Sequence, residues 1–185
     1  NSIKVNLLIR VKSTKTHDIY NYMDGPLKNL LVVDLTRVLV GPYCTMILSD
    51  LGARVIKVEA PEIGDDSRKF GPFIKDYSAY FMSLNRGKES IALNLKNNEE
   101  DKKIFDKILS KADILVENFK PGTLEKWGFG WKDINKKYPK LIYASASGFG
   151  QTGPLKELPA YDMVVQGMGG LMSVTGQPNS EPTRV

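Results

Sequence analysis

A buried strand, a helix and a second buried strand follow one another early in the sequence, and this order limits the fold more than any other feature. "LLVVDL" (30–35) and "RVIKVE" (54–59) are short, β-branched apolar runs, typical of strands covered on both faces. "GPYCTMILSDLG" (41–52) lies between them, with Pro42 near its start and Gly52 at its end, as expected at helix ends. The pattern predicts a βαβ unit with parallel strands and a right-handed crossover.

The same alternation continues along the chain. Further strands are predicted at 90–95, 113–119 and 141–148, and helices at 99–111 after an Asn98 cap, at 121–125 and at 131–138. Residues 60–80 are rich in Gly, Pro, Asp and Lys and are predicted to form a long loop. We therefore predict a doubly wound, Rossmann-like α/β fold, with a mostly parallel sheet and helices on both faces. Ligands of such sheets bind at the carboxyl ends of the strands.

The composition excludes several classes of protein. Of the 185 residues, 42% are hydrophobic and 25% are charged, which is typical of a folded domain with one core. Charged residues interrupt every apolar stretch before it reaches the roughly 20 residues of a membrane helix, so no membrane span is predicted. With one cysteine, Cys44, and one histidine, His17, we expect neither an internal disulfide nor a metal site.

Residues 1–23 differ in charge from the rest of the chain. They hold four basic residues and one acidic residue, whereas residues 24–185 hold 22 basic and 20 acidic ones. A basic segment of this kind is typical of a mitochondrial transit peptide, and a disordered tail is the alternative. We expect a mitochondrial location, otherwise a cytoplasmic one. The nearly neutral remainder gives little support to nucleic-acid binding, so no nucleic-acid partner is expected.

Polar residues follow three of the predicted strands, in "DLTR" (34–37), "VEAPEIGDDSR" (58–68) and "VENFKPG" (116–122). Asn118, before Pro121 and a predicted helix, suits an anion site built from side-chain and backbone N–H groups. The alternative is that Asn118 only caps the turn. The first strand is not followed by G-x-G-x-x-G, which disfavours a nicotinamide or flavin enzyme.

Five segments in order carry a family resemblance. They are "LLVVDLTRVLVGPYCTMILSDLGARVIKVEAPEIGDDSR", "NRGKESIALNLK", "ADILVENFKPGTLEKWGFGW", "YASASGFGQTGP" and "YDMVVQGMGGLMSVTG". Together they resemble the N-terminal half of the class III CoA-transferases, which include formyl-CoA transferase, carnitine CoA-transferase and alpha-methylacyl-CoA racemase. Within the family the sequence is most similar to the succinyl-CoA:glutarate branch. Residues 24–185 are therefore interpreted as an incomplete N-terminal CoA-binding domain of that family.

The resemblance implies that CoA or an acyl-CoA is a substrate and that no cofactor is permanently bound. Its CoA-binding positions correspond to Leu93, Lys96, Asn118 and Lys126, and also to Arg68. Cations at these positions suit the 3′-phosphate and diphosphate of CoA. For the two lysines the alternative is an ordinary solvated side chain.

Two departures from the family pattern are Ala60, where some relatives have a basic residue, and Pro159, where formyl-CoA transferase has a lysine. Tyr161 stands where racemases of the family have a histidine base, so transfer is favoured over racemisation. Tyr161 and Asp162 would line the acyl pocket. Their alternative is a structural role at the start of a helix.

A dicarboxylic acid needs a cation in its pocket, and Arg37 is the candidate. Arg37 could instead pair with Asp34 or with the Asp65–Asp66 loop. The resemblance also implies a nucleophilic aspartate, which attacks the acyl-CoA to give an anhydride and then an aspartyl-CoA thioester. That residue is expected just beyond Val185, so no catalytic residue is assigned within the chain.

The resemblance further implies an interlocked homodimer, which is expected only for a full-length protein. We predict that the chain alone exposes apolar surface that such an assembly covers. The leading hypothesis is the CoA-binding half of a transferase that moves CoA between an acyl-CoA and a free carboxylic or dicarboxylic acid. The alternatives are a non-catalytic CoA- or acyl-CoA-binding fragment, half of a racemase, and a generic α/β domain.

Overall fold

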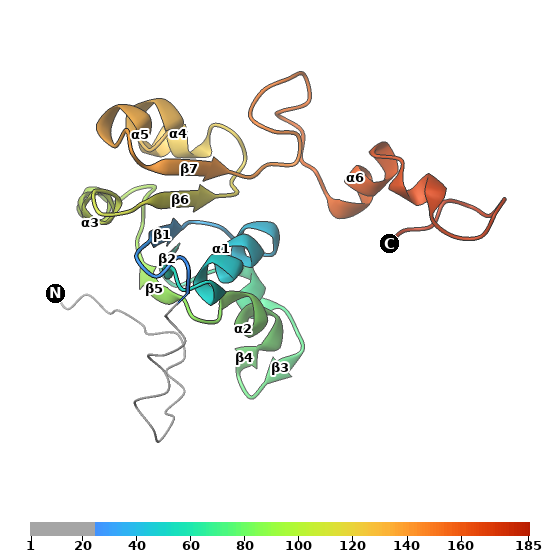
Figure 1. Cartoon of the computed structure of the whole chain (residues 1–185), viewed down its shortest axis with the longest axis horizontal. Helices are drawn as coiled ribbons and strands as arrows, with labels where there is room; N and C mark the ends of the chain where they lie inside the picture. Colours follow the sequence, from blue (N-terminus) through green and yellow to red (C-terminus); the bar gives the residue numbers. More distant parts are fainter. Residues whose placement is uncertain (1–24) are drawn as a thin grey trace. The chain divides into compact units, whose positions relative to one another are not determined.

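A computed structural model describes residues 25–185 (Figure 1). The transit-peptide prediction for residues 1–23 lies outside this range. The chain divides into two compact units, one that ends at Ala146 and one that comprises Ser147–Val185, and each is described by itself. The assignment of residues 24–185 to one CoA-binding domain stays a prediction.

The first unit contains a five-stranded, wholly parallel sheet, as predicted. Its strands are β1 (Leu31–Asp34), β2 (Arg54–Glu59), β5 (Glu89–Ala92), β6 (Ile114–Glu117) and β7 (Ile142–Ser145). They lie in the order β5-β2-β1-β6-β7 (Figure 1). The chain builds outward from β1 first in one direction and then in the other. The order therefore reverses between β1 and β6, and this is the switch point of a doubly wound fold.

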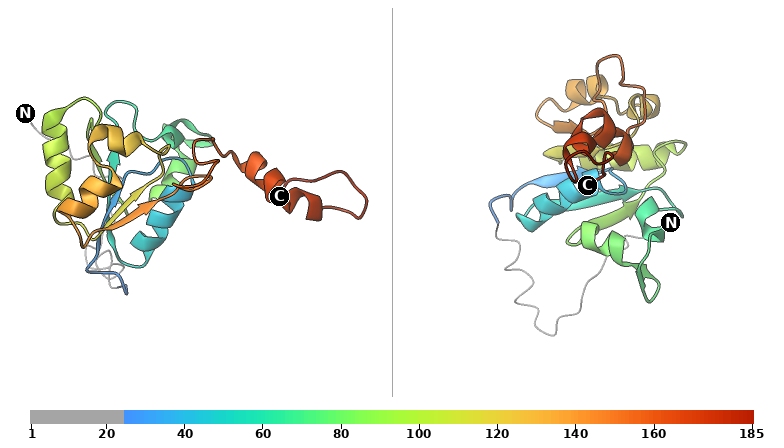
Figure 2. Two further views of the ribbon diagram at one scale, coloured as in Figure 1. Left: turned by 90° about the horizontal axis from the view of Figure 1, so that it is seen from above. Right: turned by 90° about the vertical axis from the view of Figure 1, so that its right-hand side faces the viewer.

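Helices cover both faces of this sheet, which confirms the predicted fold class. α1 (Val40–Asp50) lies on one face, and α3 (Glu99–Leu109), α4 (Thr123–Trp127) and α5 (Trp131–Lys137) lie on the other, as the left view of Figure 2 shows. The larger core forms under α3–α5, where the rings of Phe105 and Phe129 meet edge to face with their centroids 4.8 Å apart. A smaller core packs under α1 around Val32 and Val55.

The residues predicted to start and end the helices α1 and α3 lie at those helix ends in the structure. The Asn98 side chain accepts hydrogen bonds from the backbone N–H groups of Glu100 and Asp101, at 3.0 and 3.3 Å, so it is the N-cap of α3. Pro42 lies in the first turn of α1, where a missing N–H costs no helical hydrogen bond. Gly52 follows the end of α1 with a φ of 98°, a value that favours glycine.

The prediction of an unbroken loop over 60–80 was wrong. This segment contains a 3₁₀ turn, η2 (Asp66–Lys69), and a small hairpin of β3 (Phe73–Ile74) and β4 (Tyr77–Ser78). A further helix, α2 (Ala79–Asn85), begins directly after it. Side-chain capping explains η2 and α2, because Asp65 accepts from the Ser67 N–H and Ser78 accepts from the Phe81 N–H.

The second unit contains α6 (Asp162–Met168) and the 3₁₀ turn η3 (Leu171–Val174). Tyr161 is the N-cap residue of α6 and Asp162 lies in its first turn, but the Tyr161 side chain is exposed and is not packed there as the structural alternative expected. The Gln166 side chain contacts both the N–H and the carbonyl of Val185, at 2.9 and 3.2 Å. Within residues 25–185, none of the helices is both long enough and apolar enough to cross a membrane.

Candidate functional site

A pocket of about 590 Å³ opens at the carboxyl edge of the sheet in the first unit. The segments that follow β1, β2, β5 and β6 form its wall, together with two residues of α4, Thr123 and Trp127. The lining combines apolar side chains with a few charged ones, among them Arg37, Lys57, Glu59, Asp65, Lys96 and Lys120. Since the pocket includes the switch point between β1 and β6, it lies where sheets of this topology bind ligands.

Asn118 joins the two strand ends at the switch point. Its Oδ1 accepts from the Arg37 N–H and its Nδ2 donates to the Arg37 carbonyl, both at 2.8 Å. The Asn118 side chain thus pairs with the backbone of the β1–α1 turn, and the turn-capping alternative did not anticipate this partner. The Arg37 guanidinium is 3.2 Å from Asp66 and lies over the Phe119 ring. Of the two partners that the structural alternative offered, Arg37 pairs with the Asp65–Asp66 loop and not with Asp34, and its role toward a substrate carboxylate stays a prediction.

Two buried ion pairs lie beside the pocket. The Lys57 ammonium is 2.9 Å from an Asp65 carboxylate oxygen, and the Lys88 ammonium is 3.0 Å from Asp34; all four side chains are buried. Burial alone would raise the pKa of Asp34, but Lys57 and Lys88 outweigh it and hold this pKa below its ordinary value. Burial lowers the pKa of Lys88 to about 8 even though Asp34 opposes the shift.

Arg68 in η2 also forms an ion pair, with Glu59 at the end of β2. Its Nε and Nη2 donate to the two carboxylate oxygens of Glu59, each at 2.7 Å, and its guanidinium stacks on the Phe81 ring at 3.9 Å. Burial would raise the pKa of Glu59, but hydrogen bonds from Arg68 and Ser90 outweigh it, so the pKa is lowered. The donors that face Glu59 are therefore already in use, although Arg68 keeps a third of its surface exposed.

The other predicted residues are placed as follows. Leu93, which is buried, and Lys96, which is exposed, line the pocket directly after β5. Asn118 lies next to the lining residue Phe119, and Lys126 is exposed on α4 beside Trp127. The structure thus brings Arg37, Leu93, Lys96 and Asn118 to one edge of the sheet.

Tyr161 and Asp162 belong to the second unit, where Tyr161 is exposed and Asp162 accepts a hydrogen bond from Gln166.

Sequence reasoning missed the buried lysines Lys57 and Lys88. A signal for Lys57 was present, because it interrupts the strand run "RVIKVE" at a position that faces the interior. Lys88 has no such signal, since it lies between the turn after α2 and the start of β5, outside the predicted strands. The missed pair Glu117–Ser145, at the ends of β6 and β7, was equally hidden because its partners are 28 residues apart.

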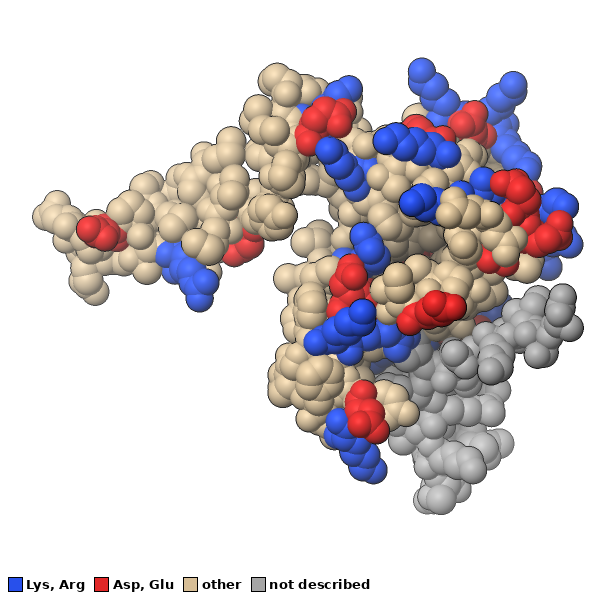
Figure 3. All heavy atoms as spheres, turned by 180° about the vertical axis from the view of Figure 1, so that it is seen from behind, with Lys and Arg blue, Asp and Glu red and all other residues tan. Residues whose placement is uncertain are grey.

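On the face displayed in Figure 3, acidic side chains lie among the basic ones over much of the first unit. Several lysines pair with neighbouring acids, as Lys102 does with Glu99 and Lys137 with Asp106. This agrees with the nearly equal numbers of acidic and basic residues in 24–185.

A five-stranded parallel sheet with this strand order and a pocket at its switch point defines a doubly wound, Rossmann-like α/β domain. Sequence comparison identifies the family. The chain matches CoA-transferase family III over residues 27–185, and it belongs to that family.

Several curated relatives carry transferase names. The chain is 57% identical to an acetyl-CoA:oxalate CoA-transferase of Acetobacter aceti, over 87% of this chain and 41% of the relative. It is 47% identical to the human succinyl-CoA:glutarate CoA-transferase, over 86% and 36% respectively. Identity therefore does not single out the succinyl-CoA:glutarate branch. The chain spans about two fifths of the length of these relatives.

Solved structures support the same assignment. A CAIB/BAIF family protein from Brucella suis superposes with a TM-score of 0.81 at 44% identity, over 87% of this chain and 43% of that one. A hypothetical protein from Mycobacterium tuberculosis gives a TM-score of 0.76 at 37% identity, over 86% of this chain and 43% of that one.

Proposed function

We propose that this chain binds CoA and acyl-CoA in the pocket at the carboxyl edge of its sheet, as part of a CoA-transferase. The observation that carries the proposal is the position of this pocket at the switch point, with Leu93 and Lys96 in its wall. Membership of CoA-transferase family III supports CoA thioesters as the substrates. No separate cofactor is needed, because the thioester itself is the activated group.

The pocket suits the two chemical parts of CoA. Apolar side chains such as Ile63, Leu95 and Trp127 offer surface for the adenine ring. Lys96 and Lys120 line the same pocket, and ammonium groups bind phosphate oxygens as point charges. Lys126, on the exposed side of α4, provides a further cation nearby. We assign Lys96 and Lys126 to the phosphates of CoA, and Leu93 to the apolar wall.

The reaction we propose transfers CoA from an acyl-CoA to a free carboxylic acid. In the mechanism that the family resemblance implies, an aspartate carboxylate attacks the thioester carbonyl, the C–S bond breaks, and CoA leaves as the thiolate. The thiolate then attacks the aspartyl carbonyl of the anhydride, which releases the donor acid and forms an aspartyl-CoA thioester. The acceptor carboxylate repeats these two steps in reverse. Each step exchanges one activated acyl group for another.

We propose a dicarboxylic acid as one of the acids. Relatives of this chain are named for oxalate, glutarate and mesaconate, and each of these acids has two carboxyl groups. One carboxylate reacts, so the second needs a cation. Arg37 is suited to this role because its side chain is about half exposed at the pocket and its guanidinium has more N–H donors than the contact with Asp66 uses.

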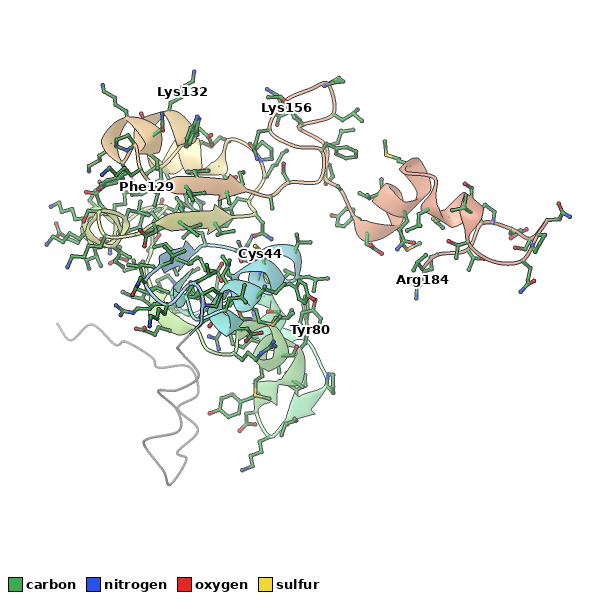
Figure 4. All side chains as sticks on the ribbon, viewed as in Figure 1. Cys44, Tyr80, Phe129, Lys132, Lys156 and Arg184 are labelled. Atoms are coloured by element: carbon green, nitrogen blue, oxygen red, sulfur yellow. The ribbon has the colours of Figure 1, made fainter. Side chains whose placement is uncertain are left out.

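Isothermal titration of the chain with CoA tests the proposal. We expect saturable binding that weakens about tenfold in Lys96→Ala, because a charge-assisted hydrogen bond to phosphate is lost. Lys132→Ala is the matched control, since Lys132 is exposed on α5 and does not line the pocket (Figure 4). Absence of saturable binding would refute the proposal. Binding without transfer between succinyl-CoA and a free acid, in the longest natural form of the protein, would favour the non-catalytic alternative.

The remaining parts of the proposal concern assembly and location. A homodimer would cover apolar side chains such as Val40, Tyr43 and Ile47, which α1 exposes. Sedimentation analysis of the natural protein tests this. A mitochondrial location, supported by the composition of residues 1–23, is tested by fractionating the source cells.

A further inference from the structure

Side chains of β1 itself and of segments distant in sequence bind five of the six backbone N–H and C=O groups of the β1–α1 turn, residues Thr36–Val38. The Thr36 N–H donates to Asp34, and the Thr36 carbonyl accepts from the Lys57 ammonium at 2.7 Å. Asn118 pairs with both the N–H and the carbonyl of Arg37, and the Val38 N–H donates to Asp65 at 3.1 Å. Three consecutive peptide groups thus have side-chain partners.

These partners are themselves firmly held. Lys57 and Asp65 are buried and form an ion pair with each other, and Asp65 also accepts two hydrogen bonds from Ser67. Asn118 follows β6, on the opposite side of the turn from β2. The turn is therefore held from both neighbouring strands, so its conformation is fixed by the sheet.

The turn that they hold is strained. Val38 has a φ of 69°, in the left-handed region that β-branched residues rarely adopt. Such conformations persist where the surroundings over-determine them, and they cluster at ligand-binding sites. The strain therefore indicates that the turn must present a particular group in a particular direction.

Arg37 is the residue that this turn presents. Its guanidinium lies at the pocket between Asp66 at 3.2 Å and the Phe119 ring at 5.4 Å, and half of the side chain is exposed. The Asn118 amide group is engaged on the Arg37 backbone through both its oxygen and its nitrogen. This leaves Asn118 poorly placed to act as a main ligand of CoA.

We propose that Asn118 is a positioning residue, which acts through Arg37 to direct the guanidinium at the free carboxylate of a dicarboxylic acyl-CoA. The inference rests on the proposed CoA-transferase function and deepens it, because it names the group that is recognised. Loss of Asn118 frees the Arg37 backbone, so the guanidinium loses its fixed direction. Selectivity for the carboxylate then falls, whereas the affinity for the CoA portion is retained.

Succinyl-CoA and butyryl-CoA provide the probe, because their acyl chains have four carbons and differ by a terminal carboxylate. The measurement is the ratio of the two dissociation constants, obtained by titration of the 185-residue chain, with free CoA titrated alongside. We expect the chain to prefer succinyl-CoA about tenfold, as for a partly exposed charge-assisted contact. Arg37→Met and Asn118→Ala should each bring the ratio close to one and leave the CoA affinity within about twofold.

A double variant separates positioning from a structural role. In the Arg37→Met background, Asn118→Ala should lower the melting temperature as it does in the wild type, but should not change the thioester ratio further. If Asn118→Ala does not fold, Asn118→Asp provides the same comparison, since it keeps the acceptor for the Arg37 N–H. If the Asn118 change weakens the binding of succinyl-CoA, butyryl-CoA and free CoA equally, Asn118 is a direct CoA ligand and the inference is overturned. A wild-type ratio of one would also overturn it, whereas no CoA binding at all would refute the proposed function itself.

Discussion

Arg68 and Glu59 form a two-point ion pair in which both nitrogen–oxygen distances are 2.7 Å. Glu59 is buried, with 5% of its side chain exposed, whereas Arg68 keeps 33% exposed. The pair joins the end of β2 to the η2 turn, and Glu59 also accepts from the Asp65 N–H and from Ser90. Arg68 therefore stabilises the wall of the pocket, whatever further part it has in CoA binding.

Replacement of Arg68 should destabilise the protein. In Arg68→Ala the buried Glu59 carboxylate loses its cation, and we expect the free energy of unfolding to fall by about 2 kcal/mol, less than for a fully buried pair. Denaturant unfolding measures this. Arg54→Ala is the control, because Arg54 forms a similar two-point pair with Glu89 in which both side chains are exposed. That change should cost less than about 1 kcal/mol, and equal losses in the two variants would contradict the argument.

The buried Lys88 should make stability depend on pH in the alkaline range. Its pKa is about 8 in the folded chain and 10.5 for the unperturbed group, so between these values the unfolded chain binds more protons. This group alone then makes the free energy of unfolding rise with pH, by up to about 3 kcal/mol over the whole interval.

Lys88→Met removes this contribution. The stability of the wild type relative to the variant should therefore increase between pH 8 and pH 10, as measured by urea unfolding at a series of pH values. Lys132→Met, at an exposed position, should follow the wild type throughout. If the difference in the free energy of unfolding between wild type and Lys88→Met is constant or falls with pH, the Lys88 amine does not titrate in this range.

The strain at Val38 predicts an unusual order of stability between two variants. At a φ of 69° a Cβ atom costs about 1 kcal/mol or more, and glycine has no Cβ. Val38→Gly and Val38→Ala lose nearly the same side-chain packing. We therefore expect Val38→Gly to melt at the higher temperature, although glycine is usually the less stabilising of the two because its unfolded chain is more flexible. If Val38→Ala is the more stable variant, the strain has been relaxed elsewhere.

Local signals explain which parts of the fold were predictable. The alternating strands and helices, the Asn98 cap and the Gly52 helix end each depend on a few neighbouring residues, and all appear in the structure. The segment 60–80 was wrongly predicted because its short elements depend on single capping side chains, Asp65 and Ser78, in a polar stretch.

The candidate site was predictable only in part. Strand ends placed Arg37 and Asn118 at one edge, because all strands are parallel, whereas Leu93 and Lys96 were named only through the family resemblance. The partner of Asn118 was not predictable, since Arg37 is 81 residues away in sequence. Pairings of this kind arise from register between distant strands and from buried charges, and neither produces a periodic pattern.

Glu117 offers a second test of buried charge, now in the acidic range. It lies at the end of β6, where its carboxylate accepts from the Phe119 N–H at 2.8 Å and from Ser145. Burial raises its pKa above the ordinary 4.5, because the two hydrogen bonds do not compensate for lost hydration. As pH rises above 4.5 the unfolded chain loses this proton first, so the contribution of Glu117 to the free energy of unfolding falls until the folded group has also ionised.

Glu117→Gln should therefore gain stability relative to the wild type as pH rises from 4 to 8. Its amide can still accept from Phe119, and it can donate to the Ser145 hydroxyl, so the turn that carries Asn118 is retained. Urea unfolding at several pH values gives the comparison, with Glu157→Gln as the control, because Glu157 is exposed and is not among the charges that shift the pKa of Glu117. If the two variants behave alike across this range, the buried carboxylate is ionised at little cost, and desolvation is not what sets its pKa.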